Sequence, residues 1–395
     1  MKYAIIPAAG LATRFLPASK AIPKELFPIL DKPAVQYIVE EAVSAGISSV
    51  VFVSGSGKEA ILDHFDKINP KFNLSKLSEE IKNKINSLDS MIDVFSVRQK
   101  EPLGLGHAVF KGVQMTKNDP FAVLLPDMLL VPKKGVSSMK KMIEIHKSTG
   151  FSVIALMKVP EEMKGSYGIA EVKECENNIF EIKKLFEKPS KGETSSNLAI
   201  VGRYVFSPAI AEILENSSPG KNGEIQLTDA IVELLKKEKV LGVVIDDDTL
   251  VFDTGNVEGF VLANSYLAVK REPEMAEKIA SFICDSDKRP WGYWISLEKK
   301  ENYQVKRIYI YPNEKLSLQK HKFRSETWTV VGGSGFITIG EKVFKAEAGQ
   351  TFQIEKGEIH RAEAEGKGLE IIEVQKGEYL GEDDIERIED KYGRE

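Results

Sequence analysis

The sequence predicts a chain of two fold classes: an α/β domain built on a doubly wound mixed sheet, followed by an all-β barrel. The chain has 395 residues, which is too long for one ordinary hydrophobic core. Short apolar runs alternate with helical patterns through about the first 130 residues. After residue 288, strand-like runs separated by Gly and Asn follow one another closely, which is typical of an all-β barrel.

The N-terminal elements alternate between strand and helix. Residues 3–7 form a short apolar run that leads into a glycine turn at residues 9–12. Helical spacing of apolar residues predicts helices over 33–45 and 58–65, and apolar runs predict strands over 49–54, 94–97 and 122–125. Alternation of this kind predicts a sheet that binds its ligands at the carboxyl ends of the strands.

Three later stretches indicate the domain organisation. Apolar residues from Leu74 to Ile92 are spaced by three or four and predict one amphipathic helix, which we expect to form a packing or dimer surface. Short strands dominate from 152 to 205, and helices return after them. Residues 271–288 are polar and irregular and predict a linker. We therefore expect a first domain over residues 1–284 and a barrel over residues 285–395.

Composition and charge exclude several classes of protein. Apolar residues make up 42% of the chain and charged residues 29%, as in a soluble globular protein. The net charge of −5 argues against nucleic-acid binding, and there is no apolar run of about 18 residues that would span a membrane. No signal-peptide pattern opens the sequence, so we expect a cytoplasmic protein. Cys175 and Cys284 lie far apart and indicate neither a disulfide framework nor a zinc ribbon.

The stretch after the first strand has the composition of a phosphate-binding loop. Small residues at 8–12 let backbone N–H groups approach a phosphate, and Arg14 and Lys24 add positive charge suited to a triphosphate. The loop is neither the GxxxxGK[ST] of P-loop enzymes nor the GxGxxG of dinucleotide-binding folds. It therefore points away from ATPases and dehydrogenases.

The stretch IPAAGLATRFLPASKAIPKELFPILDKPAVQYIVEEAVSAGI resembles the opening of bacterial UTP–glucose-1-phosphate uridylyltransferases. The likeness continues in order through VRQKEPLGLGHAVF, LLPDMLL, SYGIAEV, FEKP, SSNLAIVGRYVFSP, GEIQLTDAI and FDTGNVEGF, over about residues 1–270. The resemblance implies a Rossmann-like nucleotidyltransferase domain. It also implies a Mg²⁺-dependent reaction in which UTP and glucose-1-phosphate give UDP-glucose and pyrophosphate.

The same resemblance implies a role for each matching residue. The nucleotide would be bound by Ala9, Gly10, Leu11, Gln99 and Gly104, with Gln99 and the glycines holding the uracil. Arg14 and Lys24 would neutralise the β- and γ-phosphates, and Asp127 and Asp253 would hold Mg²⁺ beside the α-phosphate. Lys188 would bind the sugar phosphate, while sugar hydroxyls would meet Gly168, Glu187 and Asn197.

The chemistry of nucleotidyl transfer agrees with this set of residues. An in-line attack on the α-phosphorus brings negative groups together, and a metal ion with cationic side chains offsets their repulsion. Hard Mg²⁺ prefers carboxylate and phosphate oxygens. A sugar phosphate is already ionised, so we expect no general base.

Without the resemblance, the same residues have simpler interpretations. Asp253 follows an acidic run and fits a solvated surface cluster, Asp127 fits a cap after a strand, and Lys188 fits a turn. The GEIQLTD segment at 223–229 fits a helix start and, in the family, a wall on the sugar side. One departure concerns Ala12, where the family usually has a second glycine. Its methyl group is expected to crowd the phosphates or to oppose a positive φ.

The barrel carries the spacing of a cupin (jelly-roll) domain. Gln319, His321, Glu326 and Gly333 match the first cupin motif, and Gly349, Gly357 and His360 match the second, with Glu355 and Ala364 where Pro and Asn are usual. Residues i and i+2 of a strand face the same side, so Gln319 and His321 are expected to point into the barrel with Glu326 and His360. The set predicts a divalent transition metal (Zn, Fe, Mn or Ni). The alternative is an empty barrel that mediates dimerisation.

The barrel region also resembles the C-terminal part of bifunctional mannose-1-phosphate guanylyltransferase/mannose-6-phosphate isomerases, in RPWG, QVKRIYIYPNEKLSLQKHKFRSETWTVV and LGEDDIERIEDKYGR. The chain departs from that family at Phe323 and Thr327, where histidines are usual. Three functions remain open: a uridylyltransferase with an accessory cupin, a bifunctional GDP-mannose-forming enzyme, and an inactive sugar-nucleotide sensor. In each case we expect a homo-oligomer.

Overall fold

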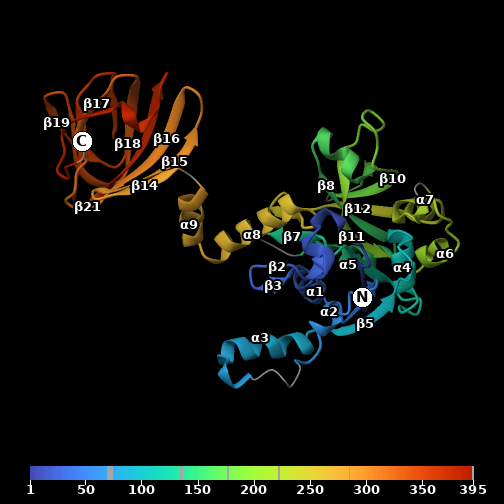
Figure 1. Ribbon diagram of the computed structural model, residues 1–395. Coiled ribbons are helices and arrows are strands. Elements are labelled where there is room, and N and C mark those ends of the chain that lie inside the picture. The colour runs from blue at the N-terminus through green and yellow to red at the C-terminus, as the bar shows by residue number, and fades with distance from the viewer. Residues whose placement is uncertain (69–73, 134–136, 176–177, 221–222, 284, 394–395) are drawn as a thin grey trace. The chain divides into compact units, whose positions relative to one another are not determined.

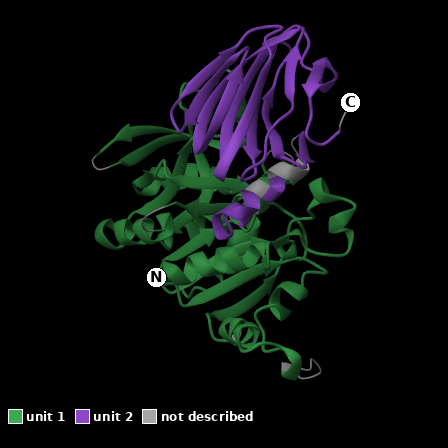
Figure 2. Cartoon of the chain, turned by 90° about the vertical axis from the view of Figure 1, so that its left-hand side faces the viewer, with its two compact units in different colours: residues 1–267 green, residues 268–395 purple. Residues whose placement is uncertain are grey.

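The computed structural model describes residues 1–68, 74–133, 137–175, 178–220, 223–283 and 285–393. The chain divides into two compact units, residues 1–267 and 268–395 (Figure 2). The predicted boundary falls on residue 284, which lies outside the described residues, and it stays a prediction. Among the described residues, no helix is both long enough and apolar enough to cross a membrane.

The first unit is built on a nine-stranded mixed sheet (Figure 1). Its order is β5 (Asp93–Arg98), β4 (Ser49–Ser54), β1 (Tyr3–Ala8), β6 (Phe121–Leu124), β11 (Leu198–Phe206), β8 (Ser152–Lys158), β12 (Val240–Val244), β10 (Ile179–Glu187) and β9 (Gly168–Glu174). The first four strands are parallel, and β11 runs antiparallel to both of its neighbours, β6 and β8.

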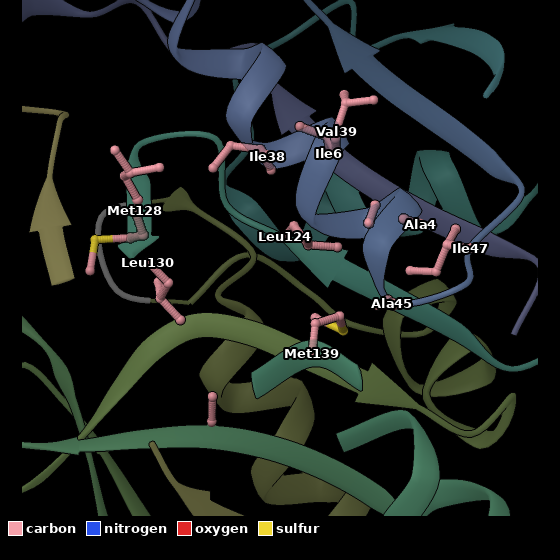
Figure 3. Close-up of a cluster of buried hydrophobic side chains, with 14 of the residues drawn as sticks. Ala4, Ile6, Ile38, Val39, Ala45, Ile47, Leu124, Met128, Leu130 and Met139 are labelled. Carbon is pink, nitrogen blue, oxygen red and sulfur yellow. The ribbon is translucent and has the colours of Figure 1, made fainter. Parts of the chain in front are cut away.

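Alternate residues of the strands enter two separate cores, one on each face of this sheet. In β1, Ala4 and Ile6 belong to one core and Tyr3 and Ile5 to the other, which is the two-residue period of a strand. The helices α1 (Ala34–Ser44) and α5 (Ser138–Thr149) pack on the first face, shown in Figure 3. The helices α4 (Leu105–Val113), α6 (Ala209–Glu215) and α7 (Leu227–Lys237) pack on the second. The predicted doubly wound α/β sheet is therefore confirmed.

Two predicted helices differ from those observed. The helix expected over 58–65 is the single turn α2 (Ala60–Asp63). The helix expected from Leu74 to Ile92 is interrupted: a 3₁₀ turn, η4 (Leu74–Lys76), precedes α3 (Glu79–Asp89). Ser78 begins α3, because its Oγ accepts a hydrogen bond from the N–H of Ile81 (3.3 Å). The apolar residues of α3 are not buried within this unit, and Ile81 is 44% exposed.

Most of the segment over 271–288, predicted as irregular, is regular structure, so the prediction of irregular structure was wrong. The helix α8 (Val257–Arg271) is followed by α9 (Glu274–Ile283), and the barrel strands begin with β14 (Ser286–Arg289). Pro273 directly precedes α9, and its fixed φ suits the start of a helix. The polar residues of this segment, Glu and Lys, are themselves good helix formers, so polarity was a poor sign of irregular structure here.

The second unit is a curled, all-antiparallel sheet, which confirms the predicted barrel. Its strands after β14 are β15 (Gly292–Lys299), β16 (Tyr303–Ile310), β17 (Leu318–His321), β18 (Arg324–Ile339), β19 (Lys342–Glu347), β20 (Thr351–Ile354), β21 (His360–Gly377) and β22 (Ile385–Glu389). The long strands β18 and β21 pair along their length, from Arg324 opposite Gly377 to Ile339 opposite His360. β18 is a bulged strand, whose register against β21 shifts between Val330 and Gly332 and again between Gly333 and Gly335.

The loop after β1 contains a strained residue. Ala12 has φ 52° and ψ 38°, in the left-handed region. Its carbonyl accepts a hydrogen bond from Ser19 Oγ (2.7 Å). Ala12 therefore adopts the positive φ that its methyl group was expected to oppose, at a conformational cost of roughly 1–2 kcal/mol.

Replacing Ala12 by glycine should stabilise the first unit. We expect Ala12→Gly to raise the free energy of unfolding by about 1 kcal/mol, because the left-handed strain is relieved at a smaller entropic cost. Urea unfolding of the full chain measures this. Ala45→Gly is the control, because Ala45 has an ordinary φ of −84° and should only lose stability. A loss of stability in both variants would contradict the assignment of strain to Ala12.

Candidate active site

The loop at residues 9–12 lies at the carboxyl edge of the parallel strands. Because β1 lies between β4 and β6 and runs parallel to both, their ends open onto one edge of the sheet. A hollow of about 490 Å³ lies beside the loop. Its wall includes seven residues predicted to bind nucleotide, phosphate or metal: Ala9, Gly10, Leu11, Lys24, Gln99, Gly104 and Asp127.

Gln99 and Gly104 both line this hollow. Gln99 is 6% exposed, and its Nε2 donates a hydrogen bond to the carbonyl of Gly104 (3.2 Å). Gly104 has φ +97°, and a Cβ there would lie 2.7 Å from the carbonyl oxygen of Ile225. No side chain fits at this turn, so glycine is required.

The segment at 223–229 touches both ends of the site. The N–H of Ile225 donates to the carbonyl of Leu103 (2.8 Å), and Glu224 lines the hollow beside the loop. Further along, Thr228 Oγ1 donates to Glu187 Oε2 (2.6 Å). This segment was expected on the sugar side; its beginning also lies beside Gly104, and its end lies beside Glu187.

The two predicted metal aspartates are brought together by a short ladder. The strand β7 (Met128–Pro132) pairs antiparallel with β13 (Thr249–Asp253), which sets Asp253 opposite Met128. The N–H of Thr254 then donates to the carbonyl of Asp127 (2.7 Å). A Cβ at Gly255 would lie 2.9 Å from Asp127 Oδ2 and 2.9 Å from Asp253 Oδ1. Both carboxylates therefore face the same small space, which is open because residue 255 has no side chain.

Each of these carboxylates has a predicted phosphate-binding cation as its neighbour. Lys24 Nζ donates to Asp127 Oδ2 (2.6 Å), and Arg14 Nη1 lies 3.9 Å from Asp253 Oδ2. Next to Lys24, Glu25 is buried and accepts a hydrogen bond from Lys58 Nζ (2.6 Å). Lys58, expected only as a helix start, thus anchors the segment that carries Lys24.

The residues predicted to bind the sugar lie where β9 and β10 meet. Gly168 begins β9 and pairs with Glu187 at the end of β10. Lys188 follows with φ 46°, its side chain 62% exposed and its Nζ 3.8 Å from Glu187 Oε1. Asn197 directly precedes β11, and its carbonyl accepts a hydrogen bond from the N–H of Val159 (3.0 Å). The role predicted for the Asn197 side chain stays a prediction.

Tyr167 connects the sugar-side residues to the carboxylates. Its carbonyl accepts a hydrogen bond from the N–H of Lys188 (3.2 Å). Burial raises the pKa of the Tyr167 phenol, and the negative charge of Asp253 raises it further while Arg14 opposes the shift. The phenol therefore lies within electrostatic range of the Asp253–Arg14 pair, which links the two halves of the site.

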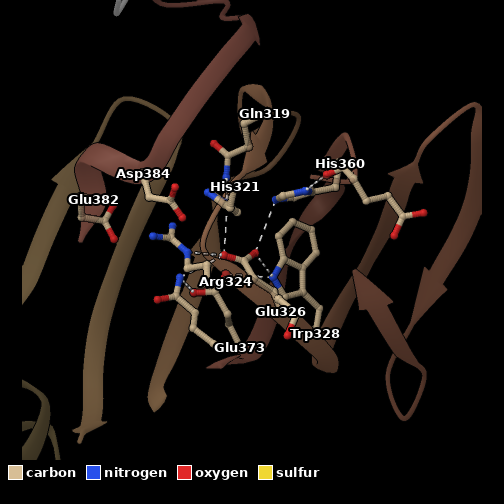
Figure 4. A network of polar contacts seen from close by, with 12 residues as sticks. Gln319, His321, Arg324, Glu326, Trp328, His360, Glu373, Glu382 and Asp384 are labelled. Carbon is tan, nitrogen blue, oxygen red and sulfur yellow. Dashed lines mark hydrogen bonds and ion pairs between the residues drawn. The ribbon is translucent and has the colours of Figure 1, made fainter. Parts of the chain in front are cut away.

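The second predicted site lies inside the barrel (Figure 4). His321, Glu326 and His360 are each no more than 2% exposed, and one ligand atom from each lies within 4.8 Å of the others. His321 Nε2 is 3.1 Å from Glu326 Oε1, and His360 Nε2 is 3.5 Å from Glu326 Oε2. Gln319 pairs with His360 across the strands, and its Nε2 is 3.5 Å from His321 Nε2.

The two histidines differ in which ring nitrogen has a hydrogen-bond partner. His360 Nδ1 lies 2.8 Å from the carbonyl of Glu358, which can only accept, so Nδ1 carries the proton of the neutral ring. Its Nε2 is then a lone pair that is buried and has no hydrogen-bond partner among the described residues. His321 instead leaves Nδ1 without a partner. A cation among these atoms would satisfy the Nε2 of His360.

Glu326 is the centre of a buried polar network. Arg324 Nε and Gln375 Nε2 each donate to its Oε1 (3.1 Å), and Trp328 Nε1 donates to its Oε2 (3.1 Å). Burial would raise the pKa of Glu326, but the neighbouring imidazoles of His321 and His360 outweigh burial and lower the pKa well below its usual value. Burial, reinforced by this charge, raises the pKa of Glu373 to about 8. Glu326 is therefore the ionised carboxylate of the pair at neutral pH.

Phe323, where the related enzymes usually have histidine, lies outside this network. Its side chain is 42% exposed and packs edge-on against Tyr379, with ring centroids 6.2 Å apart. The departure at Phe323 therefore removes no ligand from the barrel interior.

The comparisons with known proteins agree with both units. The nucleotidyl transferase family matches residues 3–270, and the family described as mannose-6-phosphate isomerase C-terminal matches residues 280–390. The UTP–glucose-1-phosphate uridylyltransferase of Staphylococcus epidermidis is 42% identical over 289 residues, covering 73% of this chain and 99% of that protein. Its namesake from Staphylococcus haemolyticus is 44% identical over 287 residues, covering 72% and 97%.

Solved structures give the same result. A UDP-glucose pyrophosphorylase complexed with UDP-glucose has a TM-score of 0.63 and 37% identity, covering 68% of this chain and 99% of that one. A UTP-bound UGPase from Acinetobacter baumannii has a TM-score of 0.64 and 36% identity, covering 72% and 98%. The phosphate loop, the paired aspartates and these likenesses agree: the chain belongs to the nucleotidyl transferase family and is a nucleotidyltransferase that carries a C-terminal cupin-type barrel.

Proposed function

We propose that the chain transfers the uridylyl group of UTP to glucose-1-phosphate, forming UDP-glucose and releasing pyrophosphate. The observation that carries the proposal is the convergence of Asp127 and Asp253 around Gly255, beside the loop at 9–12. The names of the staphylococcal relatives and the UTP and UDP-glucose bound in solved relatives support these substrates. They favour this reaction over GDP-mannose formation and over an inactive sensor.

The residues present fit a Mg²⁺ ion. Two carboxylates that face a space free of side chains are suitable ligands for a hard cation. Asp127 and Asp253 would hold the ion, which would offset the charge that develops around the α-phosphate. Lys24 and Arg14, which contact these carboxylates, would bind the phosphates that leave as pyrophosphate.

The sugar side would bind and orient the nucleophile. Lys188 would hold the phosphate of the sugar, whose ionised oxygen needs no general base to attack. Glu187, fixed by Thr228 Oγ1, would accept hydrogen bonds from sugar hydroxyls near Gly168 and Asn197. Gln99 and Gly104 would hold the uracil at the other end of the hollow, with Ala9, Gly10 and Leu11 along the nucleotide.

We further propose that the barrel holds one divalent transition metal through His321, Glu326 and His360, with Gln319 as a fourth ligand. The bare, buried Nε2 of His360 facing a carboxylate supports this, because a mixed nitrogen and carboxylate set suits Zn, Fe, Mn or Ni. The carbonyl of Glu358 would orient His360 as metal-bound histidines usually require. Self-association and a cytoplasmic location stay predictions.

Removing either aspartate should disable the transferase without unfolding it. We expect Asp127→Asn and Asp253→Asn each to lower turnover by roughly 10²–10⁴, the usual effect of losing one strong electrostatic element. Pyrophosphate release measures turnover, and thermal unfolding checks the fold. Asp247→Asn is the control, because Asp247 is an exposed member of the acidic run before Asp253. A folded Asp253→Asn enzyme with near-normal turnover would exclude Asp253 from the site.

Pyrophosphate release across nucleoside triphosphates and sugar-1-phosphates tests the substrates. A pocket that hydrogen-bonds the base rejects a base lacking the matching groups, so we expect UTP with glucose-1-phosphate to exceed GTP with mannose-1-phosphate by at least about tenfold. Gln99→Ala should narrow that ratio. Equal or faster turnover with GTP and mannose-1-phosphate would refute the proposal in favour of GDP-mannose formation.

The barrel metal is tested by elemental analysis of the purified full chain. We expect about one transition-metal ion per chain, and loss of most of it in His360→Ala, because a three-residue ligand set would lose one nitrogen. Lys322→Ala is the matched control, since Lys322 adjoins His321 but is exposed. A chain that takes up no transition metal even when Zn²⁺, Mn²⁺, Ni²⁺ or Fe²⁺ is supplied would favour the empty, dimer-forming barrel.

A further inference from the structure

An arginine with no exposed surface lies directly beneath the turn that carries Asp127. Arg203, on β11, is 0% exposed. Its guanidinium meets the carboxylate of Glu41 on α1, with Nε 3.1 Å from Oε1 and Nη2 2.7 Å from Oε2. A buried charge is costly unless it is paired and hydrogen-bonded, and this pair satisfies that condition.

Other donors of Arg203 go to backbone carbonyls, two of which flank Asp127; the Nη1 also donates to the carbonyl of the adjacent Gly202 (3.2 Å). Its Nη1 donates to the carbonyl of Leu125 (3.2 Å), and its Nη2 donates to the carbonyl of Met128 (2.6 Å). These carbonyls stand two residues before and one residue after Asp127. On its other side the same turn is held by Thr254, whose N–H donates to the carbonyl of Asp127 (2.7 Å). The guanidinium thus spans the whole turn.

The bulge in β11 explains how a side chain of the central sheet reaches this turn. The register of β11 against β8 shifts between Ile200 and Tyr204, and Gly202 has φ +73°. The N–H of Leu125 donates to the carbonyl of Gly202 (3.0 Å), and a Cβ at Gly202 would lie 2.9 Å from the Leu125 side chain. A bulge of this kind redirects the side chain that follows it, here Arg203.

We propose that Arg203, with Glu41 as its counter-ion, is a positioning residue that fixes the Asp127 carboxylate for metal binding; this rests on the proposed role of Asp127. Arginine suits the task because its planar fork offers five donors in fixed directions, so that two carbonyls and a carboxylate are held at once. Lysine keeps the charge but not this geometry. Arg203 has no exposed surface with which to contact a substrate, and Glu41 is bonded to its guanidinium, so in this proposal both act through the turn.

The expected effect is a weaker metal site in a folded protein. Groups that orient a metal ligand typically change metal affinity by about 10–100-fold when they are removed. Arg203→Lys and the milder Glu41→Asp should therefore each weaken Mn²⁺ binding by about tenfold or more. The half-saturating Mg²⁺ concentration for turnover should rise in parallel, while the KM for UTP at saturating Mg²⁺ stays near that of the parent.

The test uses the full chain in a His360→Ala background, so that the barrel contributes no metal site. Mn²⁺ affinity without nucleotide is measured by electron paramagnetic resonance. Glu238→Gln is the matched control, because Glu238 also accepts buried hydrogen bonds in this unit, from Ser152 Oγ (2.7 Å) and Ser207 Oγ (2.9 Å). It should lower the unfolding midpoint without changing Mn²⁺ affinity. If the Arg203→Lys variant does not fold, the Mn²⁺ affinity of the Glu41→Asp variant tests the proposal by itself.

Asp127→Asn separates the two claims. If Asp127→Asn binds Mn²⁺ like the parent, the proposed metal role of Asp127 is wrong, and the positioning role fails with it. If Asp127→Asn loses Mn²⁺ but the Arg203 and Glu41 variants keep parental affinity, only the positioning role is overturned. The proposal is supported if these variants weaken Mn²⁺ binding and Arg203→Lys adds no further loss to Asp127→Asn, since residues that act through one ligand are not additive.

Discussion

The antiparallel pairing of β7 with β13 is the constraint on which the rest of the transferase site depends. It sets Asp253 opposite Met128, next to Asp127, although the two aspartates come from distant parts of the chain. Gly255 then leaves the space that both carboxylates face. Two like charges held this close repel each other, and Lys24 and Arg14 offset that repulsion. The pairing thus assembles the acidic and basic halves of the site together.

Both units hold carboxylates in fixed positions, but in different surroundings. In the transferase unit, the side chains of Asp127 and Asp253 are 32% and 28% exposed, so a metal and a triphosphate have access. In the barrel, Glu326 is buried, and donors from Arg324, Trp328 and Gln375 already surround it. Groups that are fixed before their ligand arrives spend little energy on reorganisation. The exposed site suits turnover, and the buried one suits a resident ion.

The sequence was sufficient for the parts of the fold that local pattern determines. Apolar runs predicted the strands β1, β4 and β6. The two-residue period of a strand predicted that the side chains of Gln319 and His321 face the same side, and they do. It failed where a local pattern was ambiguous. The polar segment before the barrel forms the helix α9, although its composition suggested irregular structure. The helical spacing of apolar residues runs from Leu74 to Ile92 without a break, but the helix α3 begins only after its cap, Ser78.

Motif resemblance assigned roles to most of the candidate site residues, and the geometry added roles for residues that lie inside the quoted motifs but had none assigned. Gly255 and Thr254 matter only because a strand from elsewhere in the chain brings Asp127 beside them. In the sequence, Arg203 is one charged residue in an otherwise apolar run, and its partner Glu41 is one of the polar residues of a helix. Such pairs depend on tertiary contacts between segments far apart in sequence, which periodicity does not report.

The central claim is that Asp127 and Asp253 bind the same metal ion in the presence of nucleotide. Crystals grown with UTP and Mn²⁺ in place of Mg²⁺ would locate that ion by its anomalous scattering. The account predicts a peak within about 2.3 Å of a carboxylate oxygen of each aspartate, near the octahedral distances of this class of ion. A peak bound by the phosphates alone, with Asp253 turned away from it, would contradict the account.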